Sequence, residues 1–413
     1  MENNKRMVIR NSLFSVGVGL AAGLASTVFL FSLDYVTKTR EDNPVIIWFL
    51  PFAGLLIGWL YLRFGGTSHR GSALIIEEIV NPRERIPARM TPLVLVSTLL
   101  THLFGGSAGR EGTAVQMGAA LSDQIANRWK VDPKERKALL LAGAGAGFGS
   151  AIGAPWAGVF FGMEMIQIGK FRLTAFWQCL IASGTSSLVT HFLGAPHTLY
   201  PAPHFFAYSL PGFFSVAVSS VLFGILAAGF ARTTHQVEYL FKRTISFSPL
   251  RSFIGGWFLV GLYAWEGSYR YTGLGISVIQ ESMYQPGAFR DVFFKFIFTV
   301  LTLASGFKGG EFIPLVFMGT TLGSALSQWL PISSNLLGAV GFAAVFGAAS
   351  NTPLASTLMA IELFGPAIAP YALLGCFLSY FCSGHSGIYH SQLVREHKWD
   401  RLKSWFTLLR LKF

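Results

Sequence analysis

Charged side chains are scarce in this sequence. Asp, Glu, Lys and Arg together make up 13% of its 413 residues, whereas a soluble domain carries about 25%. A soluble chain of this length would have too few charges to cover its surface. Hydrophobic residues reach 52%, and the mean hydropathy is +0.50. The composition therefore indicates a membrane protein.

Cysteine is also rare, with three residues at Cys179, Cys376 and Cys382. Their spacing matches neither a CxxC pair nor a metal-ligand pattern, so we expect buried free thiols, no disulfide framework and no bound metal. The apolar segments contain no His/Asp/Glu cluster at metal spacing and no Ser/His pair, which argues against a membrane-embedded enzyme. The glycine-rich run 105–112 lacks the GK[ST] ending of a phosphate-binding loop, so we expect neither a nucleotide nor another cofactor.

Polar linkers and hydrophilic modules are missing as well, so we expect one transmembrane domain over residues 1–413 and no soluble regulatory domain. The formal net charge is +12. The basic residues flank apolar runs, as the positive-inside rule expects, which predicts a multi-pass protein with both termini in the cytoplasm. We expect its location to be a bacterial inner (plasma) membrane. No polar domain interleaves basic and aromatic residues, so nucleic acid is not an expected partner. The basic clusters are Lys5–Arg10, Arg83–Arg89, Arg128–Lys137 and Arg395–Lys412.

Long apolar runs are few. Ser12–Leu33, Val45–Leu62 and Leu210–Ala231 are long enough to cross a hydrocarbon core of ~30 Å as helices. Ser12–Leu33 is too long for the core of a cleaved signal, so we expect a retained helix. An amphipathic tail at 395–413 is expected to lie on the membrane lipid. The other apolar segments are short and glycine-rich: Met90–Phe104, Ala138–Ile152, Pro155–Ile166, Phe312–Leu330, Leu336–Ala349 and Pro353–Phe364.

The chain contains an internal repeat with a period of about 200 residues. GSAGRE (106–111) matches GFKGGE (306–311), with Gly and Glu positions offset by 200, and downstream Met117 and Gly118 match Met318 and Gly319 after a slip of one residue. A second pair of blocks, 142–164 and 339–362, aligns a proline and a glutamate at an offset of 198: Pro155 and Glu164 with Pro353 and Glu362. Two ordered blocks indicate a duplicated transporter, in which substrates bind between the repeats on broken helices. We expect repeats over about 12–195 and 210–392; the sequence leaves open whether they are parallel or inverted.

Four segments place Gly, Pro or small polar residues directly before an apolar helical run. A helix N-terminus presents unpaired backbone N–H groups and the positive end of a dipole of about +0.5 charge, and glycine lets an ion approach the backbone. Several broken helices aimed at one point would bind an anion without Lys or Arg, which would hold it too tightly for turnover. The segments are Gly71–Ala73, Gly109–Thr113, Gly309–Pro314 and Gly384–Tyr389.

Glu111 lies inside one of these breaks, between Arg110 and Gly112. A carboxylate within a membrane segment is costly and by default functional. When ionised it only accepts hydrogen bonds, so it competes with an anion for the same donors. Protonation would release those donors and couple anion passage to proton passage. The alternative is a glutamate at the membrane interface that pairs with Arg110.

Four motifs together resemble the CLC family of chloride channels and anion/proton antiporters. GREGT (109–113) resembles the family's GREGP, GGEFIP (309–314) resembles its GxFxP, and GSALIIEE (71–78) occupies the place of GSGIPE. Tyr389, in SGIYHSQ, resembles the family's pore tyrosine. The motifs occur in family order and span nearly the whole chain.

The resemblance implies an all-α, inverted-repeat membrane fold in a homodimer, with broken helices meeting at a central anion site in each subunit. Glu111 would be the gating and proton-coupling residue. The chloride or fluoride ion would contact Ser72, Tyr389 and the backbone N–H of Phe312, and the anion-binding set would also hold Glu311 and Ile313. The motif backbone would comprise Gly71, Gly109, Arg110, Gly112, Thr113, Gly309, Gly310 and Pro314.

Three departures from the common motifs are similar to the fluoride/proton antiporter branch of the family. They are Thr113 in place of proline, Glu311 at a usually apolar position, and Met165 where chloride/proton exchangers carry an inner proton-transfer glutamate. A protonated Glu311 would donate firmly to fluoride, which is small and strongly hydrated. Alternatively, Glu311 is an acid that caps the following helix. Ser72 and Ile313 resist the assignment, because branch members often replace the serine and usually carry Thr at the second position.

We therefore interpret the chain as a transport protein that exchanges a halide for protons, with fluoride ahead of chloride. A chloride/proton antiporter and a passive chloride channel of the same fold stay open, because both use the gating glutamate. The remaining polar residues are expected to be structural. Glu77 and Glu78 would cap a helix or face the cytoplasm, Glu164 and Glu362 would act at helix ends, and His102 would be a packed histidine.

Overall fold

The computed structural model describes residues 2–203, 207–394 and 398, so the expected tail at 395–413 lies, but for one residue, outside the described part. The described chain is helical, and its strand-like contacts are isolated bridges. The first half holds α1 (Glu2–Asp42), α2 (Leu50–Leu60), α3 (Ser72–Val80), α4 (Met90–Leu103), α5 (Glu111–Arg128), α6 (Pro133–Ile152), α7 (Pro155–Glu164) and α8 (Phe176–Phe192). The second half holds α9 (Leu210–Thr244), α10 (Ser248–Glu266), α11 (Ile276–Tyr284), α12 (Phe289–Ala304), α13 (Phe312–Leu326), α14 (Ser334–Ser350), α15 (Pro353–Phe364) and α16 (Ala369–Cys382). Short 3-10 or π-helical turns are η1 (Pro44–Phe49), η2 (Tyr61–Gly65), η3 (Gly66–Arg70), η4 (Leu173–Ala175) and η5 (Pro366–Ile368).

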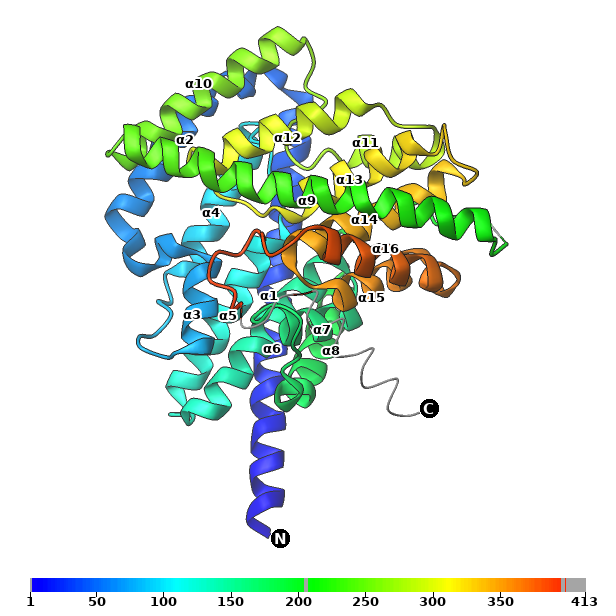
Figure 1. Ribbon diagram of the computed structural model, residues 1–413. Coiled ribbons are helices and arrows are strands. Elements are labelled where there is room, and N and C mark those ends of the chain that lie inside the picture. The colour runs from blue at the N-terminus through cyan, green and yellow to red at the C-terminus, as the bar shows by residue number, and fades with distance from the viewer. Residues whose placement is uncertain (1, 204–206, 395–397, 399–413) are drawn as a thin grey trace.

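Long helices are few, as the sequence indicates. In the described part of the chain, three helical stretches are long and apolar enough to cross a membrane: Ile9–Asp42, Pro44–Val80 and Leu210–Thr244. The expected helices at Ser12–Leu33 and Leu210–Ala231 lie within α1 and α9. In Figure 1, α1 runs upright through the molecule and α9 crosses in front of the upper half. The other apolar helices are short, also as expected.

The expected helix at Val45–Leu62 lies within the helical stretch Pro44–Val80, but it is not one continuous α-helix. The chain forms η1 first and begins α2 only at Leu50. Pro44 and Pro51 each lie in the first turn of their element. Proline has no N–H to donate and restricts the residue before it, so each proline is compatible with a helix start and not with a helix interior. After α2 the chain breaks again through η2 and η3 before α3 begins.

The two halves meet at a symmetric contact between their glycine-rich breaks. The N–H of Gly109 donates to the carbonyl of Gly310 at 2.6 Å, and the N–H of Gly310 donates to the carbonyl of Gly109 at 2.8 Å. Hydroxyl groups beside this bridge repeat the pattern. Thr302 Oγ1 accepts from the N–H of Ser107 at 3.1 Å. A two-fold axis within the chain therefore passes through the bridge.

The contact between Ser107 and Thr302 has a symmetry-related counterpart, and the two together show the sequence offset between the halves. Thr101 Oγ1 accepts from the N–H of Lys308 at 3.3 Å, so each member of this pair lies 201 residues from its counterpart in the other pair. The helices agree, since α5 begins at Glu111 and α13 at Phe312. The sequence alignment of Glu111 with Glu311 at an offset of 200 is therefore wrong by one residue. Glu311 corresponds instead to Arg110, the residue before α5.

The second repeated block has the offset of 198 that the sequence indicates. Glu164, at the end of α7, accepts hydrogen bonds from the start of α15 at 3.3 and 3.0 Å, and Glu362 in α15 accepts from the start of α7 at 2.9 and 2.8 Å. The donors are the N–H groups of Leu354 and Ala355 in α15 and of Trp156 and Ala157 in α7. Each carboxylate satisfies helix N–H groups that have no intrahelical partner. The expected structural role of both glutamates is confirmed.

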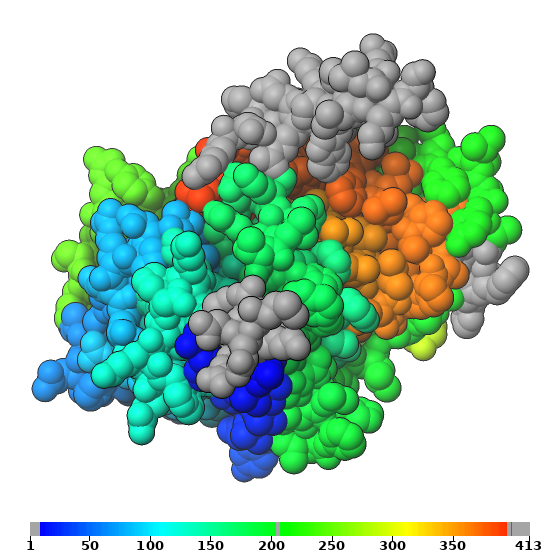
Figure 2. All heavy atoms as spheres, turned by 90° about the horizontal axis from the view of Figure 1, so that it is seen from below, coloured from blue at the N-terminus to red at the C-terminus, as the bar shows by residue number. Residues whose placement is uncertain are grey.

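The repeats are inverted, which answers the question that the sequence left open. In Figure 1, α5 and α6 lie in the lower half of the molecule, whereas their counterparts α13 and α14 lie above them. Seen from below, residues of the first half, blue to green, cover most of the face, and orange residues of the second half lie at one side (Figure 2). Cys179 and Cys376 are buried and all three cysteines are free, as expected.

Candidate functional site

Glu111 is the first residue of α5 and is 1% exposed. Its carboxylate lies 3.3 Å from the guanidinium of Arg110 and accepts a hydrogen bond from the Arg110 N–H at 3.2 Å. Arg110 Nη2 also donates to Thr198 Oγ1 at 3.1 Å. The pairing with Arg110 that the alternative interpretation names is present, but the pair is buried, with Arg110 only 6% exposed. Burial makes an ionised carboxylate costly, and the guanidinium of Arg110 offsets part of that cost.

The symmetric helix, α13, begins at Phe312 and has Glu311 in the N-cap position. The side chain of Glu311 makes no capping hydrogen bond, so the structure gives no support to the capping interpretation. The first N–H groups of α5 and of α13 have no intrahelical partner. These N–H groups of α5 and of α13 lie on either side of the bridge between Gly109 and Gly310.

The glycines of the two motifs pack backbone against backbone. A Cβ atom at Gly109 would lie 2.9 Å from the Gly310 carbonyl oxygen, 3.0 Å from the Ile313 nitrogen and 3.2 Å from Pro314 Cδ. One at Gly112 would lie 3.0 Å from Gly310 Cα. The contact at Gly109 would be closer than real Cβ atoms come, and the one at Gly112 would be crowded, so glycine suits the point where the two helix starts meet. The glycines of GREGT and GGEFIP are thus brought together in space, whereas Gly71 lies before α3 on the cavity wall.

A cavity of about 190 Å³ opens beside the helix starts. Five of the expected site residues line it: Gly71, Ser72, Gly309, Glu311 and Tyr389. Glu111, Phe312 and Ile313 do not line it; they are buried at 1–3% exposure. The structure therefore separates the expected residues into a cavity wall and a buried layer behind it.

Ser72 is the first residue of α3. The preceding residue, Gly71, has φ +55° and ψ −131°, a conformation that a side chain would strain. The Ser72 hydroxyl accepts a hydrogen bond from Gln116 Nε2 at 3.4 Å. Since Gln116 belongs to α5, this contact joins the Ser72 helix to the Glu111 helix.

Tyr389 lies on the chain that follows α16. Its ring makes an edge contact with the ring of Phe161 at 6.4 Å between centroids. Two residues later, Ser391 Oγ donates to Glu77 Oε1 at 2.9 Å, and Glu77 also pairs with Arg70. The Tyr389 segment is therefore tied to α3 of the other half.

An aromatic cluster fills the space behind Tyr389 and Phe312. Phe148 stacks on Phe161 at 4.0 Å, and Phe312 meets Phe346 edge to face at 4.6 Å. All four rings are buried. Such a layer excludes water, which strengthens electrostatic interactions beside it.

Several polar residues of the cavity wall were not expected from the sequence, among them Ser68, Thr234, Gln116 and Lys308. Ser68 and Thr234 are buried, and their hydroxyl groups have no hydrogen-bond partner among the described residues. Gln116 and Lys308 also line the cavity, and Lys308 Nζ lies 4.3 Å from the centre of the Tyr61 ring. These residues come from four separate segments of the chain, so no linear motif joins them. Lys308 places a cation at the cavity wall, where the sequence predicted none.

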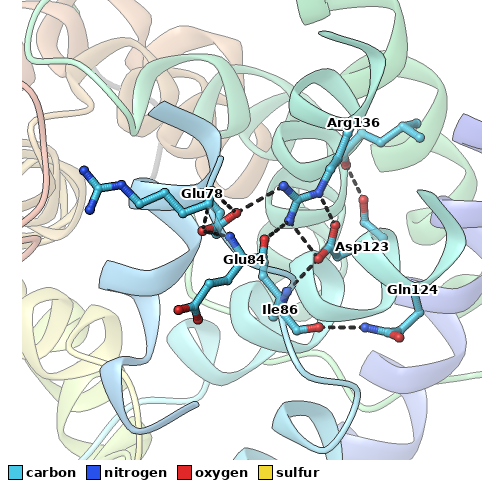
Figure 3. Close-up of polar contacts among 9 residues, drawn as sticks. Glu78, Glu84, Ile86, Asp123, Gln124 and Arg136 are labelled. Atoms are coloured by element: carbon cyan, nitrogen blue, oxygen red, sulfur yellow. Dashed lines mark hydrogen bonds and ion pairs between the residues drawn. The ribbon is translucent and has the colours of Figure 1, made fainter. Parts of the chain in front are cut away.

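A buried ion-pair network fixes α3 against α5. Arg136 Nε and Nη2 donate to the two Asp123 oxygens at 2.6 and 2.9 Å, and Nη1 donates to Glu78 at 3.1 Å (Figure 3). Asp123 also accepts from the N–H of Ile86 at 2.7 Å, and Glu78 from the N–H of Glu84 at 3.0 Å. Because Glu78 lies on α3 and Asp123 on α5, the network sets the relative position of the Ser72 and Glu111 helices. Glu78 accepts from N–H groups of the loop after its helix and is buried, so it neither caps a helix nor is exposed, contrary to the expectation from the sequence.

Two further expected residues are packed. The Thr113 hydroxyl is buried and pairs with that of Thr98 at 2.8 Å. His102 is fully buried, with Nε2 3.4 Å from the Gly109 carbonyl oxygen. The interpretation of His102 as a packed histidine is confirmed, and its ring abuts the bridge between the halves.

A family model described as voltage gated chloride channel matches residues 53–384 of the chain. This protein belongs to the voltage-gated chloride channel family. A chloride/fluoride channel protein of Pseudomonas syringae pv. tomato is 44% identical over 93% of this chain and 86% of its own. A H⁺/Cl⁻ exchange transporter of Vibrio cholerae serotype O1 is 29% identical over 84% of this chain and 81% of its own.

Solved structures of the family share the fold. A CLC-type fluoride/proton antiporter superposes with a TM-score of 0.91 at 34% identity, covering 94% of this chain and 98% of its own. A slow cyanobacterial Cl⁻/H⁺ antiporter gives a TM-score of 0.79 at 20% identity, covering 91% and 94%. At 20% identity, the similarity to the cyanobacterial antiporter shows the fold alone.

Glu164 is the neighbour of Met165 in the sequence, and its surroundings show what its carboxylate does. Both side chains are buried. The Glu164 carboxylate accepts hydrogen bonds from the N–H groups of α15 and is thus used at the start of that helix.

Proposed function

We propose that this protein exchanges fluoride for protons across a membrane, with Glu111 as the group that both substrates use. One observation carries the proposal: Glu111 is buried at the start of α5, where α13 begins on the other side of the Gly109–Gly310 bridge. The cavity lined by Ser72, Glu311 and Tyr389 lies next to it. Broken helices near the midplane, with backbone that lines a cavity, are the usual anion sites of such transporters.

In this mechanism the ion takes its donors from both halves. The hydroxyl groups of Ser72 and Tyr389 and the N–H of Phe312 and Ile313 bind the anion. The ionised Glu111 occupies the same donors when the anion is absent. Protonation neutralises the carboxylate and frees them, so a proton and an anion alternate at one place. The motif residues Gly71, Gly109, Arg110, Gly112, Thr113, Gly309, Gly310 and Pro314 hold that backbone geometry.

Glu311 gives the preference for fluoride. It lines the cavity and is not used to cap α13, so a protonated Glu311 can donate to a small anion. A hydrogen bond from a neutral acid to an anion is among the strong ones. The 34% identical structure is that of a fluoride/proton antiporter, which supports the same substrate here.

A chloride transport function is the second candidate. Ser72 and Ile313 favour it, as does the likeness to a H⁺/Cl⁻ exchange transporter. The relative at 44% identity is named as a channel, so passive conduction is the corresponding alternative to exchange. No enzyme activity, metal or cofactor enters either candidate.

We further propose that the lower end of the molecule in Figure 1 faces the cytoplasm of a bacterial cell. Arg10, near the start of α1, pairs with Glu135 at 2.8 Å, and Arg136 donates to the Glu84 carbonyl at 2.9 Å. These contacts gather the basic clusters at Lys5–Arg10, Arg83–Arg89 and Arg128–Lys137 at one end. Positive residues accumulate on the cytoplasmic side, so the N-terminus lies there; the proposal places the C-terminus, outside the described residues, on the same side.

The assembly we propose is a homodimer in lipid, each subunit one domain of two repeats at about 12–195 and 210–392. Exposed apolar side chains on α8 suit a surface that meets either lipid or a second copy. Trp177, Leu188 and Phe192 are 68%, 57% and 80% exposed. Chemical crosslinking in proteoliposomes tests the dimer.

The test of the function is efflux of fluoride and of chloride from proteoliposomes, with proton uptake recorded at the same time. Fluoride efflux with proton uptake, and much slower chloride efflux, is the expected result. Glu111→Gln should abolish the proton movement because an amide cannot exchange a proton. Fluoride flux without protons would contradict exchange, and equal chloride flux would contradict the fluoride preference.

A further inference from the structure

A cluster of three metal-ligating side chains lies at the wall of the same cavity. His235, Glu238 and His390 each offer a ligand atom, and these atoms lie within 4.8 Å of one another. All three residues line the cavity with Tyr389. His390 Nε2 and Glu238 Oε2 are 3.8 Å apart. The anion mechanism above uses none of them.

The fold, and not a linear motif, assembles the cluster. His235 and Glu238 lie three residues apart in α9, which puts them on one face of that helix. His390 follows Tyr389 on the chain after α16, which Figure 1 shows passing beneath α9. No metal-binding spacing is visible along the chain because His390 is more than 150 residues away from His235 and Glu238.

Two of the ligands are already oriented by neighbours. His235 Nε2 lies 2.8 Å from the Gly387 carbonyl oxygen, which accepts its proton and leaves Nδ1 as a lone-pair donor. Metal-binding histidines are usually held in this way. Glu238 Oε1 accepts from Lys242 at 2.6 Å, so Oε2 is the oxygen that faces His390.

We propose that His235, Glu238 and His390 bind one divalent transition-metal ion of the zinc class, and that the bound ion slows anion transport. This inference rests on the proposed transport function for its second part. Two imidazoles and one carboxylate suit Zn²⁺, whose bonds to nitrogen are about 2.0–2.1 Å, and do not suit Mg²⁺ or Ca²⁺, which take oxygen ligands. Three protein ligands leave a position for water, so the site is open and reversible.

The effect on transport follows from the position. The ion would join α9 to the segment that carries Tyr389, which limits the movement of that side chain. It would also add two positive charges to a cavity that Lys308 and Glu311 already line. An anion that passes would be held longer at the cation, and its release would slow.

Nearby cations set the strength of binding. Lys242 pairs with Glu238, Lys308 lines the same cavity, and Arg232 Nε donates to Ser386 at 2.7 Å on the adjacent segment. Their charges oppose a metal ion. Lys242→Met, which removes the closest of them and frees the second carboxylate oxygen, should therefore tighten binding.

The experiment uses the full-length protein with Zn²⁺ and Co²⁺ as probes. Co²⁺ bound by two imidazoles and a carboxylate gives a visible absorption spectrum, which reports binding without any transport. His390→Gln should weaken binding by about 10–100-fold, as loss of a metal-site group does. His390 is exposed at 57%, so its replacement leaves the fold intact. His69→Gln is the matched control, because His69 lines the same cavity outside the cluster.

Fluoride efflux from proteoliposomes is then measured at rising Zn²⁺. Inhibition in wild type and in His69→Gln, with a shift to higher zinc in His390→Gln and to lower zinc in Lys242→Met, supports the proposal. Equal inhibition in wild type and His390→Gln, inhibition by Mg²⁺ at the same concentration, or Co²⁺ binding that leaves transport unchanged overturns it. Absence of fluoride transport without any metal contradicts the proposed function instead, and the Co²⁺ spectrum still decides whether the metal site exists.

Discussion

At the residue scale, the two glutamates of the repeated motif occupy different positions. Glu111 is the first residue of its helix and is buried beside Arg110, whereas Glu311 precedes its helix and lines the cavity. The difference of one position relative to the helix start places the Glu111 side chain in the protein interior and the Glu311 side chain at the cavity. The two carboxylates can therefore have different functions although the motifs that carry them are repeated.

The role proposed for Glu311 predicts a difference between two substitutions. Glu311→Gln keeps a hydrogen-bond donor and should retain most of the fluoride flux. Glu311→Ala removes it and should lower the flux about tenfold or more, since a hydrogen bond to a charged group is worth ~1.5–3 kcal/mol and 1.4 kcal/mol is tenfold. Initial rates of fluoride efflux at matched protein content give the comparison. If Glu311→Ala transported fluoride at the wild-type rate, Glu311 would not be a fluoride-binding residue.

At the scale of elements, carboxylates and one arginine hold the short helices in register. Short helices in a membrane have ends that water does not reach, so their N–H groups need partners within the protein. Glu164 and Glu362 supply these partners at the contact of α7 with α15. Arg136 joins α3 and α5 through Glu78 and Asp123. The positions of Ser72 and Glu111 depend on such contacts more than on helix length.

Arg136→Met should destabilise the protein by about 3–5 kcal/mol, because it leaves two buried carboxylates without their cation. A lower melting temperature in detergent micelles is the readout. Lys134→Met, at an exposed position of the same helix, is the control and should change little. If Arg136→Met had the same melting temperature as Lys134→Met and the wild type, the network in Figure 3 would not stabilise the contact of α3 with α5.

Glu164→Ala should cost about 1–3 kcal/mol for each N–H group of α15 that it leaves buried without a partner. Glu362→Ala should cost less, because that side chain is only partly buried. Glu164→Gln should keep the proton coupling of the wild type, since the carboxylate acts on the helix end. Loss of coupling in Glu164→Gln with unchanged melting would give Glu164 a place in the proton path.

At the scale of the whole molecule, the two inverted halves meet in one backbone bridge, and the candidate site lies at that bridge. The sequence predicted the short helices, the free cysteines, the structural glutamates and the motifs, because each depends on local composition or on repeated residues. It indicated the offset of 201 only after the motif, at Met117 and Met318, and aligned Glu111 with Glu311 one residue out of register. The hydrogen bonds between Gly109 and Gly310 place the offset of 201 at the motif itself. The sequence also missed Gln116 and Lys308, because tertiary contacts bring these side chains to the cavity. Only the break in Val45–Leu62 had a local signal, in Pro44 and Pro51, that could have been used.

The central claim, that proton entry drives fluoride exit through this protein, is tested most directly by a pH gradient alone. Proteoliposomes hold equal fluoride inside and outside, the membrane potential is clamped at zero, and the outside is made more acidic. A fluoride electrode should record net release of fluoride against its own rising gradient, absent in Glu111→Gln. In protein-free liposomes, uncatalysed entry of HF moves fluoride the opposite way. Fluoride that stays level, or enters as in the protein-free control, would contradict the account.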